Sequence, residues 1–222
     1  MSEWPSPTDP GPGGAPDAAG GAPPVRVAGV IPAAGASRRM GTPKALLDAG
    51  GRSFVSAVVG ALVGGGCAPV VVVTGPAQAD VRRRAEGAGA LVLENPEPGE
   101  GPITSLRLAL AALGPHVDAV AVLPVDYPAV RAETVAALLD ALGVGDAPLV
   151  LPAVGGRRGH PAVFHRRLFP ELLDPRLEGG ARTVVHRHLE RARLVEVGDP
   201  AILTDIDTPQ AYRAFLGARR EP

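Results

Sequence analysis

The sequence predicts an α/β protein built on a mostly parallel sheet that is covered by helices. Short β-branched runs alternate with stretches rich in Ala and Leu, a pattern that indicates βαβ units. The runs at 70–73 and 120–123 are apolar on both faces, as strands are when helices cover both sides of a sheet. Ligands of such open sheets bind at the carboxyl ends of the strands, so we expect functional residues directly after strands.

The β-branched runs are the expected strands, and the longer Ala- and Leu-rich stretches between them are the expected helices. In chain order, the strands are expected at 25–31, 69–74, 90–93, 119–123, 148–151, 161–164 and 193–197. The helices are expected at 53–63, 77–88, 103–113, 132–142, 182–190 and 208–216.

The folded domain is expected to span residues 25–218. Residues 1–24 consist largely of Pro, Gly and Ala and show no apolar periodicity. Such a segment cannot bury enough surface to offset the entropy lost on ordering, so we expect a disordered tail at 1–24.

Composition excludes several classes of protein. The formal net charge is −1, which gives no global field favouring nucleic acid or an acidic membrane surface. The single cysteine, Cys67, excludes an intramolecular disulfide and a cysteine-based metal cage, and we expect it to be a small buried residue. No apolar run approaches the length of a membrane span, and the N-terminus lacks a secretory signal pattern, so we expect a cytoplasmic protein.

The loop after the first expected strand predicts a phosphate-binding site. Among the 22 Lys and Arg residues, Lys44 is the only lysine, and its compact, mobile ammonium suits a site that follows a phosphate through a reaction. Small residues at 33–36 would let the backbone N–H groups approach a phosphate. Arg38, Arg39 and Lys44 would neutralise a triphosphate. The spacing matches neither the Walker A loop nor the Gly-x-Gly-x-x-Gly pattern, which disfavours a P-loop ATPase and an NAD-dependent enzyme.

This loop also carries a family resemblance. The run Ala-Ala-Gly-x-Ser-x-Arg-Met-Gly-x-Pro-Lys at 33–44 resembles the leading motif of the MobA-like NTP transferases, which include molybdenum-cofactor guanylyl- and cytidylyltransferases. The resemblance implies a three-layer α/β/α sandwich that is Rossmann-like and of the glycosyltransferase-A kind. It implies catalytic roles for Lys44 and Arg39 and nucleotide contacts for Ala33, Ala34, Gly35, Ser37 and Arg38. The His-Asp-Ala-Ala-Arg-Pro run of the related methylerythritol-phosphate cytidylyltransferases is absent, which argues against that activity.

Asp126 follows the expected strand at 119–123 and is the first candidate metal ligand. A hard cation such as Mg²⁺ needs only one or two carboxylates when substrate phosphates complete its shell. The alternative is an Asp that caps the turn before Pro128. The run Asp126-Tyr127-Pro128 resembles the Asp-x-Pro metal motif of the family, which favours the ligand role.

Asp205 and Asp207 form the second acidic position. In an extended segment their side chains point to the same face, so both could meet one metal ion. Asp207 and Thr208 are also candidates to cap a helix that begins at Pro209. The segment resembles the terminal Asp-x-Asp-Thr-Pro element of the family, which implies Asp205 as a ligand and leaves Asp207 as ligand or cap.

A third segment is expected near the nucleotide. Gly101 permits a close backbone approach, and Thr104 and Ser105 could donate hydrogen bonds at the start of a helix. Asn95, Gly101 and Ser105 resemble the Asn…Gly-x-x-x-Ser element of the family, and an ordinary capped helix is the alternative for Ser105.

The glycine-rich loop at 155–161 is the candidate acceptor side. Its Arg158 and His160 suit an anionic acceptor, although they also suit an exposed turn. The Gly-His-Pro pattern and the Gly-Ala-Arg run ending at Arg182 resemble the acceptor elements of the molybdenum-cofactor cytidylyltransferases.

The resemblance implies transfer of NMP from an NTP to a small phosphorylated acceptor, with Mg²⁺ as cofactor and pyrophosphate as the leaving group. We expect CTP as the nucleotide, molybdopterin as the acceptor and a molybdoenzyme as client of the product. Guanylyl transfer, transfer to a sugar phosphate and a non-catalytic nucleotide-binding accessory role are the alternatives, and no nucleic-acid or membrane partner is expected.

Overall fold

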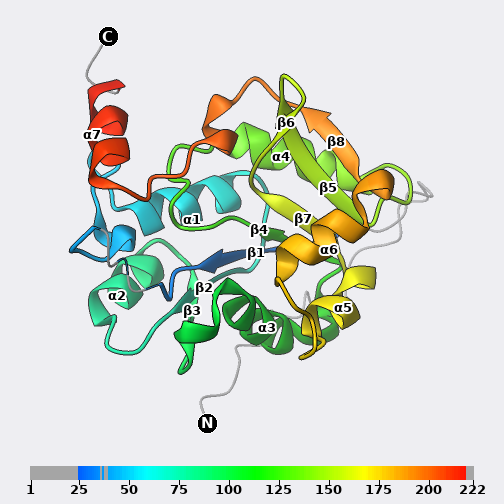
Figure 1. The fold of residues 1–222 in the computed structure, drawn as a ribbon, viewed down its shortest axis with the longest axis horizontal. Coiled ribbons are helices and arrows are strands. Elements are labelled where there is room, and N and C mark those ends of the chain that lie inside the picture. The colour runs from blue at the N-terminus through cyan, green and yellow to red at the C-terminus, as the bar shows by residue number, and fades with distance from the viewer. Residues whose placement is uncertain (1–24, 36, 38–39, 219–222) are drawn as a thin grey trace, which may run out of the picture.

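An 8-stranded sheet forms the middle layer of the molecule, and helices cover both of its faces (Figure 1). The computed structural model describes residues 25–35, 37 and 40–218. The strands lie in the order β3-β2-β1-β4-β7-β5-β6, and β8 pairs with β5. Their bounds are β1 Val27–Pro32, β2 Val70–Thr74, β3 Leu91–Glu94, β4 Ala119–Val122, β5 Leu149–Val154, β6 Arg157–Arg158, β7 Ala162–His165 and β8 Arg193–Glu196.

The sheet is mostly parallel, as predicted, with an antiparallel interruption. Strands β3, β2, β1 and β4 run parallel to one another, and β8 is parallel to β5. Strand β7 runs antiparallel to both β4 and β5. The chain can reverse after β5 because Gly155 and Gly156 adopt positive φ values of 56° and 75°, which side chains disfavour.

Two apolar cores lie on opposite faces of the sheet. Successive strand residues point to opposite faces, so Val30 and Ile31 of β1 enter different cores. Ile31 packs in the core that contains Phe54 of α1 and Leu138 of α4, whereas Val30 packs in the core that contains Leu106 of α3. The three-layer α/β/α prediction is confirmed by this arrangement. The helices are α1 Phe54–Gly64, α2 Ala79–Gly87, α3 Pro102–Leu113, α4 Ala132–Gly143, α5 Phe169–Leu173, α6 Ala181–Arg187 and α7 Pro209–Ala218.

Each expected strand and helix is present, with its ends displaced by a few residues. One short strand and one short α-helix were not predicted, namely β6 in the loop at 155–161 and the helix α5. Both are too short for a periodic pattern to reveal them. The helix expected at 182–190 ends earlier, at Arg187, and a 3₁₀ turn follows at Leu189–Arg191.

Several expectations concern residues outside the described part of the chain. The tail at 1–24 and the arginines Arg38 and Arg39 lie outside it. Within the described residues, no helix combines the length and apolar character needed to cross a membrane. Cys67 is 3% exposed, as expected for a buried residue.

Candidate active site

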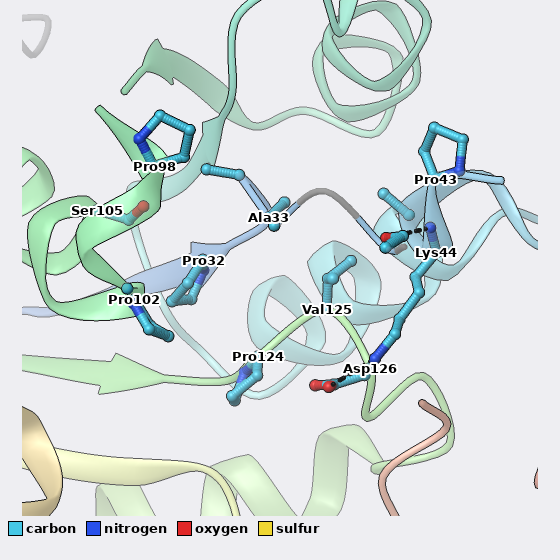
Figure 2. Close-up of a pocket in the computed structure, with 15 residues that line it drawn as sticks. Pro32, Ala33, Pro43, Lys44, Pro98, Pro102, Ser105, Pro124, Val125 and Asp126 are labelled. Atoms are coloured by element: carbon cyan, nitrogen blue, oxygen red, sulfur yellow. Dashed lines mark hydrogen bonds and ion pairs between the residues drawn. The ribbon is translucent and has the colours of Figure 1, made fainter. Parts of the chain in front are cut away.

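A cavity of about 450 Å³ opens at the carboxyl ends of β1 and β4 (Figure 2). Its volume is within the range of small-molecule sites. Its walls come from the loop after β1, the turn after β4 and the first turns of α3. The predicted site residues that line it are Ala33, Ala34, Gly35, Ser37, Lys44, Gly101, Ser105 and Asp126.

The register of the sheet explains why these segments meet. Strands β1 and β4 are parallel neighbours, with Val30 beside Val122, so the residues that follow each strand emerge at the same edge. The amide of Ala33 donates a 2.8 Å hydrogen bond to the carbonyl of Val73, which holds the start of the loop against β2. Gly75 then approaches Ala34 so closely that a Cβ on Gly75 would lie 3.0 Å from the Ala34 carbonyl oxygen.

Ser37 shapes the loop that ends at Lys44. Its φ of 48° is in the left-handed region, a conformation that costs about 1–3 kcal/mol for a residue with a side chain. Two hydrogen bonds offset this cost: the Lys44 amide donates to the Ser37 hydroxyl oxygen at 3.0 Å, and the Met40 amide donates to its carbonyl at 2.9 Å. Ser37 therefore closes the loop, and its own side chain sets the position of Lys44.

Lys44 forms an ion pair at one side of the cavity. Its Nζ lies 3.4 Å from Oδ2 of Asp126, and the two side chains are 13% and 25% exposed. Figure 2 shows the lysine side chain extending from the loop after β1 to the turn after β4. Because the pair is largely shielded from water, its charges act more strongly than those of a surface pair. The same figure places Pro98, Pro102 and Ser105 on the other side of the cavity, away from this pair.

The second acidic segment, at 205–207, lies against the turn that carries Asp126. The amide of Ile206 donates a 2.8 Å hydrogen bond to the carbonyl of Asp126, which brings Asp205 and Asp207 to the turn after β4. The electrostatics agree, because burial and, after it, the nearby carboxylates of Asp205, Asp126 and Asp207 together raise the pKa of the Tyr127 phenol to about 12.

Thr208, and not Asp207, caps the start of α7. The hydroxyl oxygen of Thr208 accepts a 3.1 Å hydrogen bond from the amide of Ala211, which is the pattern of an N-cap. Thr208 is therefore the N-cap of α7, a role for which Asp207 was also a candidate. The ligand role of Asp207 stays a prediction.

The acidic residues fit a divalent cation that also binds substrate. Among the residues that the structure describes, no group of three or more His, Cys, Asp or Glu side chains is arranged to hold a metal ion by itself. Mg²⁺ binds through one or two carboxylates together with substrate phosphates and water. Asp126 and Asp205 lie on segments in backbone contact and could supply that incomplete donor set, and their roles as ligands stay predictions.

Asn95 lies behind the wall of the cavity. It is 2% exposed, and its Nδ2 donates to Oγ1 of Thr104 at 2.8 Å and to Oγ of Ser105 at 3.2 Å. Its Oδ1 accepts from the amide of Glu97 at 2.9 Å. With these contacts Asn95 holds the first turn of α3 in place, and it is Ser105 that faces the cavity. Gly101 precedes α3 with φ of 92°, a conformation that favours glycine.

The three predicted acceptor residues do not line the cavity. Arg158 is exposed in β6, and Nε of Arg182 lies 3.4 Å from Nε2 of His186 on exposed α6. His160 packs its ring against Tyr127, with ring centroids 4.8 Å apart. Burial lowers the pKa of His160, which disfavours the cation that an anionic acceptor would attract.

Two residues that connect the acidic side of the site were not predicted. Tyr127 links the acidic segments to His160, and Ile206 anchors the second acidic segment. Tyr127 follows Asp126 directly, so its place in that motif was the available signal. Ile206 is 1% exposed, and the only hint of its role was an apolar residue between two aspartates.

The fold and the site together define a nucleotide-binding α/β enzyme of the nucleotidyltransferase class. Residues 29–193 match the model of the MobA-like NTP transferase domain. The chain belongs to this family of nucleotidyltransferases, and the predicted family and enzyme class are confirmed.

Relatives of known name span most of the chain. A nicotine blue oxidoreductase of Paenarthrobacter nicotinovorans is 32% identical over 84% of this chain and 95% of its own length. A probable molybdenum cofactor guanylyltransferase of Mycolicibacterium paratuberculosis is 29% identical over 88% of this chain and 98% of its own.

Solved structures are also similar to this chain. The Rv0371c protein of Mycobacterium tuberculosis H37Rv superposes with a TM-score of 0.77 at 28% identity, over 88% of this chain and 100% of that one. Another structure of Rv0371c, solved as a complex with manganese, has a TM-score of 0.73 at 26% identity, over 87% of this chain and 100% of that one.

Proposed function

We propose that this enzyme transfers CMP from CTP to the phosphate group of molybdopterin and releases pyrophosphate. The observation that carries the proposal is the ion pair between Lys44 and Asp126, 3.4 Å apart at one side of a cavity of nucleotide size. A triphosphate with a bound divalent cation requires both a mobile ammonium and a carboxylate in its site. When phosphate oxygens enter, the ammonium can neutralise them and the carboxylate can bind the divalent cation.

The two sides of the cavity suit the two ends of a nucleotide. Lys44, Asp126 and the small residues at 33–35 would face the triphosphate. Pro98, Pro102 and Ser105 would face the base, with the Ser105 hydroxyl available for a hydrogen bond because Asn95 already donates to its oxygen.

The reaction is a displacement at phosphorus. An oxygen of the acceptor phosphate attacks the α-phosphorus of the NTP while the bond to the bridging oxygen of the β-phosphate breaks, so one P–O bond forms and one is lost. The Lys44 ammonium would leave Asp126 to neutralise the α-phosphate and the departing pyrophosphate. Cys67 is excluded as a nucleophile, since burial raises the pKa of its thiol to about 12.

A divalent cation, Mg²⁺ in this proposal, would be held by Asp126 and Asp205, with Asp207 beside them. Bound there it would neutralise charge between these carboxylates and the triphosphate. The convergence of the carboxylates around Tyr127 supports this assignment, and so does the manganese complex of the related Rv0371c protein.

The choice of nucleotide and acceptor depends on family resemblance. The Gly-His-Pro element at His160 and the Gly-Ala-Arg element at Arg182 resemble cytidylyltransferases that act on molybdopterin. GTP is the alternative nucleotide, because a relative covering most of the chain is named a molybdenum cofactor guanylyltransferase. Arg158 and Arg182 are exposed cations outside the cavity, available to the anionic groups of an acceptor.

An oxidoreductase is the second candidate function. The relative from Paenarthrobacter nicotinovorans, named nicotine blue oxidoreductase, shares 32% identity with this chain. Hydride transfer has no use for a triphosphate site, so retention of Lys44, Asp126 and Asp205 in one place favours nucleotidyl transfer.

Thermal unfolding with CTP, GTP, ATP and UTP, each with and without Mg²⁺, tests the nucleotide; NADPH in the same panel tests the second candidate. A ligand at about 100 times its dissociation constant adds about 2.7 kcal/mol to the free energy of unfolding. We expect a Mg²⁺-dependent rise of the melting temperature with CTP, and pyrophosphate release when molybdopterin is added. A rise with NADPH alone would contradict the proposal, and a rise with GTP in place of CTP would change the nucleotide.

A further inference from the structure

His160 joins the two segments that carry the acidic residues. Its ring packs against Tyr127 with 4.8 Å between ring centroids and 58° between ring planes, and Tyr127 directly follows Asp126. The backbone of Val122, at the end of β4, is near enough to the same ring to act on its pKa. The imidazole therefore lies beside the strand and against the turn that present Asp126.

The main chain of the same loop holds the other acidic segment. The amide of His160 donates a 3.0 Å hydrogen bond to the carbonyl of Ile202, in the 3₁₀ turn Pro200–Leu203 that leads to Asp205. Gly159 lies so close to this turn that a Cβ on Gly159 would overlap the Ile202 carbonyl group. The loop and the turn are thus in direct backbone contact.

The ring itself is partly buried. Its Nδ1 is buried and has no hydrogen-bond partner among the described residues. A buried nitrogen without a partner costs free energy, so the hydrogen bonds of Nδ1 do not fix the ring, and its packing on Tyr127 does. His160 is also not among the residues that line the cavity, which separates it from direct contact with the nucleotide.

We propose that His160 is a positioning residue for the metal site: its ring, packed on Tyr127, keeps the turn of Asp126 in register with the segment of Asp205. The inference rests on the proposed function, because it requires that these two carboxylates share a divalent cation. It gives His160 a role toward the cation in place of the acceptor contact expected from sequence.

Binding of Mn²⁺ to the full chain, followed by the electron paramagnetic resonance signal of the free ion with and without CTP, tests this role. Removing the ring in His160→Ala should weaken Mn²⁺ binding about tenfold, the size of effect seen when groups that orient metal ligands are lost. His160→Phe restores a ring against Tyr127 and should return the affinity to within about twofold of the original, since packing and not proton chemistry is invoked. His116→Ala, at an exposed histidine, is the matched control and should have no effect.

Three outcomes decide the matter. Original Mn²⁺ affinity in a folded His160→Ala variant, together with a raised KM for the acceptor, would restore the acceptor role and overturn the inference. His160→Phe binding as weakly as His160→Ala at an unchanged melting temperature would also overturn it, because the ring packing would then be irrelevant. Asp126→Asn separates this inference from the proposed function. If Mn²⁺ binds to this variant with the original affinity, Asp126 is not a metal ligand, and both the proposed metal site and the inference are wrong.

Discussion

The main-chain amide of Ile206 donates a 2.8 Å hydrogen bond to the carbonyl of Asp126, and this contact assembles the acidic half of the site. Ile206 is 1% exposed and packs in the core beside α1 and α4, so the segment cannot shift without exposing it. Asp205 and Asp207 flank this buried residue, and their side chains are exposed and half-buried, respectively. One apolar side chain thus sets the place of two carboxylates.

Replacing Lys44 should abolish most turnover without unfolding the protein. In Lys44→Ala the ammonium that pairs with Asp126 at 3.4 Å is lost, and so is its charge on the leaving pyrophosphate. We expect kcat to fall about a hundredfold, as for other contacts made to charge developing in a transition state. Pyrophosphate release measures the rate, and an unchanged melting temperature serves as the control. Full turnover in the variant would rule out the mechanism proposed above.

Asp205→Asn and Asp207→Asn should show which of the two aspartates binds the divalent cation. Since Thr208 already caps α7, neither substitution removes the helix cap. We expect Asp205→Asn to raise the Mg²⁺ concentration at half-maximal rate at least about tenfold, and Asp207→Asn to raise it less. The measurement is the rate against Mg²⁺ concentration at saturating NTP. The reverse order would make Asp207 the principal ligand of the pair.

Gly159→Ala should destabilise the protein through steric overlap. The new Cβ would meet the carbonyl group of Ile202, and the backbone contact between the loop and the 3₁₀ turn would have to open. Such overpacking costs about 1–3 kcal/mol. Urea unfolding followed by circular dichroism measures the loss, and Gly99→Ala, where a Cβ would meet nothing within 4 Å, is the matched control. Equal stability of both variants would show that the loop adapts freely.

Asp118→Asn should lower stability in a pH-dependent way. The Asp118 carboxylate accepts from the amide of Arg26 at 2.9 Å and from its Nε at 3.3 Å, and these contacts hold its pKa below the usual value. The folded carboxyl group therefore binds its proton less readily than the unfolded one, so its stabilisation is complete above the unfolded pKa and is lost as pH falls through the folded pKa.

At pH 7 the variant should be less stable by about 1 kcal/mol, a value reduced for the partial exposure of the pair. The difference between the two proteins should shrink below about pH 4. Urea unfolding at a series of pH values measures it, and a difference that is constant down to pH 2.5 would show that the charge of Asp118 is not responsible.

Much of the site could be predicted because its residues occur in short motifs that follow strands. The loop that begins at Ala33 and the turn at Asp126 follow that rule, and the structure brings them to one edge of the sheet. The segment at Asp205 instead follows a 3₁₀ turn, and its family motif was the signal that predicted it. The acceptor side was harder to predict. Arg158 and Arg182 are on separate elements, and a sequence cannot show whether a histidine such as His160 points to a cavity or into the packing between two loops.

The sequence by itself determined the local features of this protein. Alternation of β-branched and Ala/Leu-rich segments specified the strands and helices, and apolar runs such as 70–73 specified central strands, because these preferences act over a few residues. Only the tertiary structure decided which segments meet. The antiparallel course of β7, the pairing of Lys44 with Asp126 and the contact of His160 with Tyr127 and Ile202 join residues far apart in the chain. Their geometry depends on strand order and on packing over the whole core, which no local pattern contains.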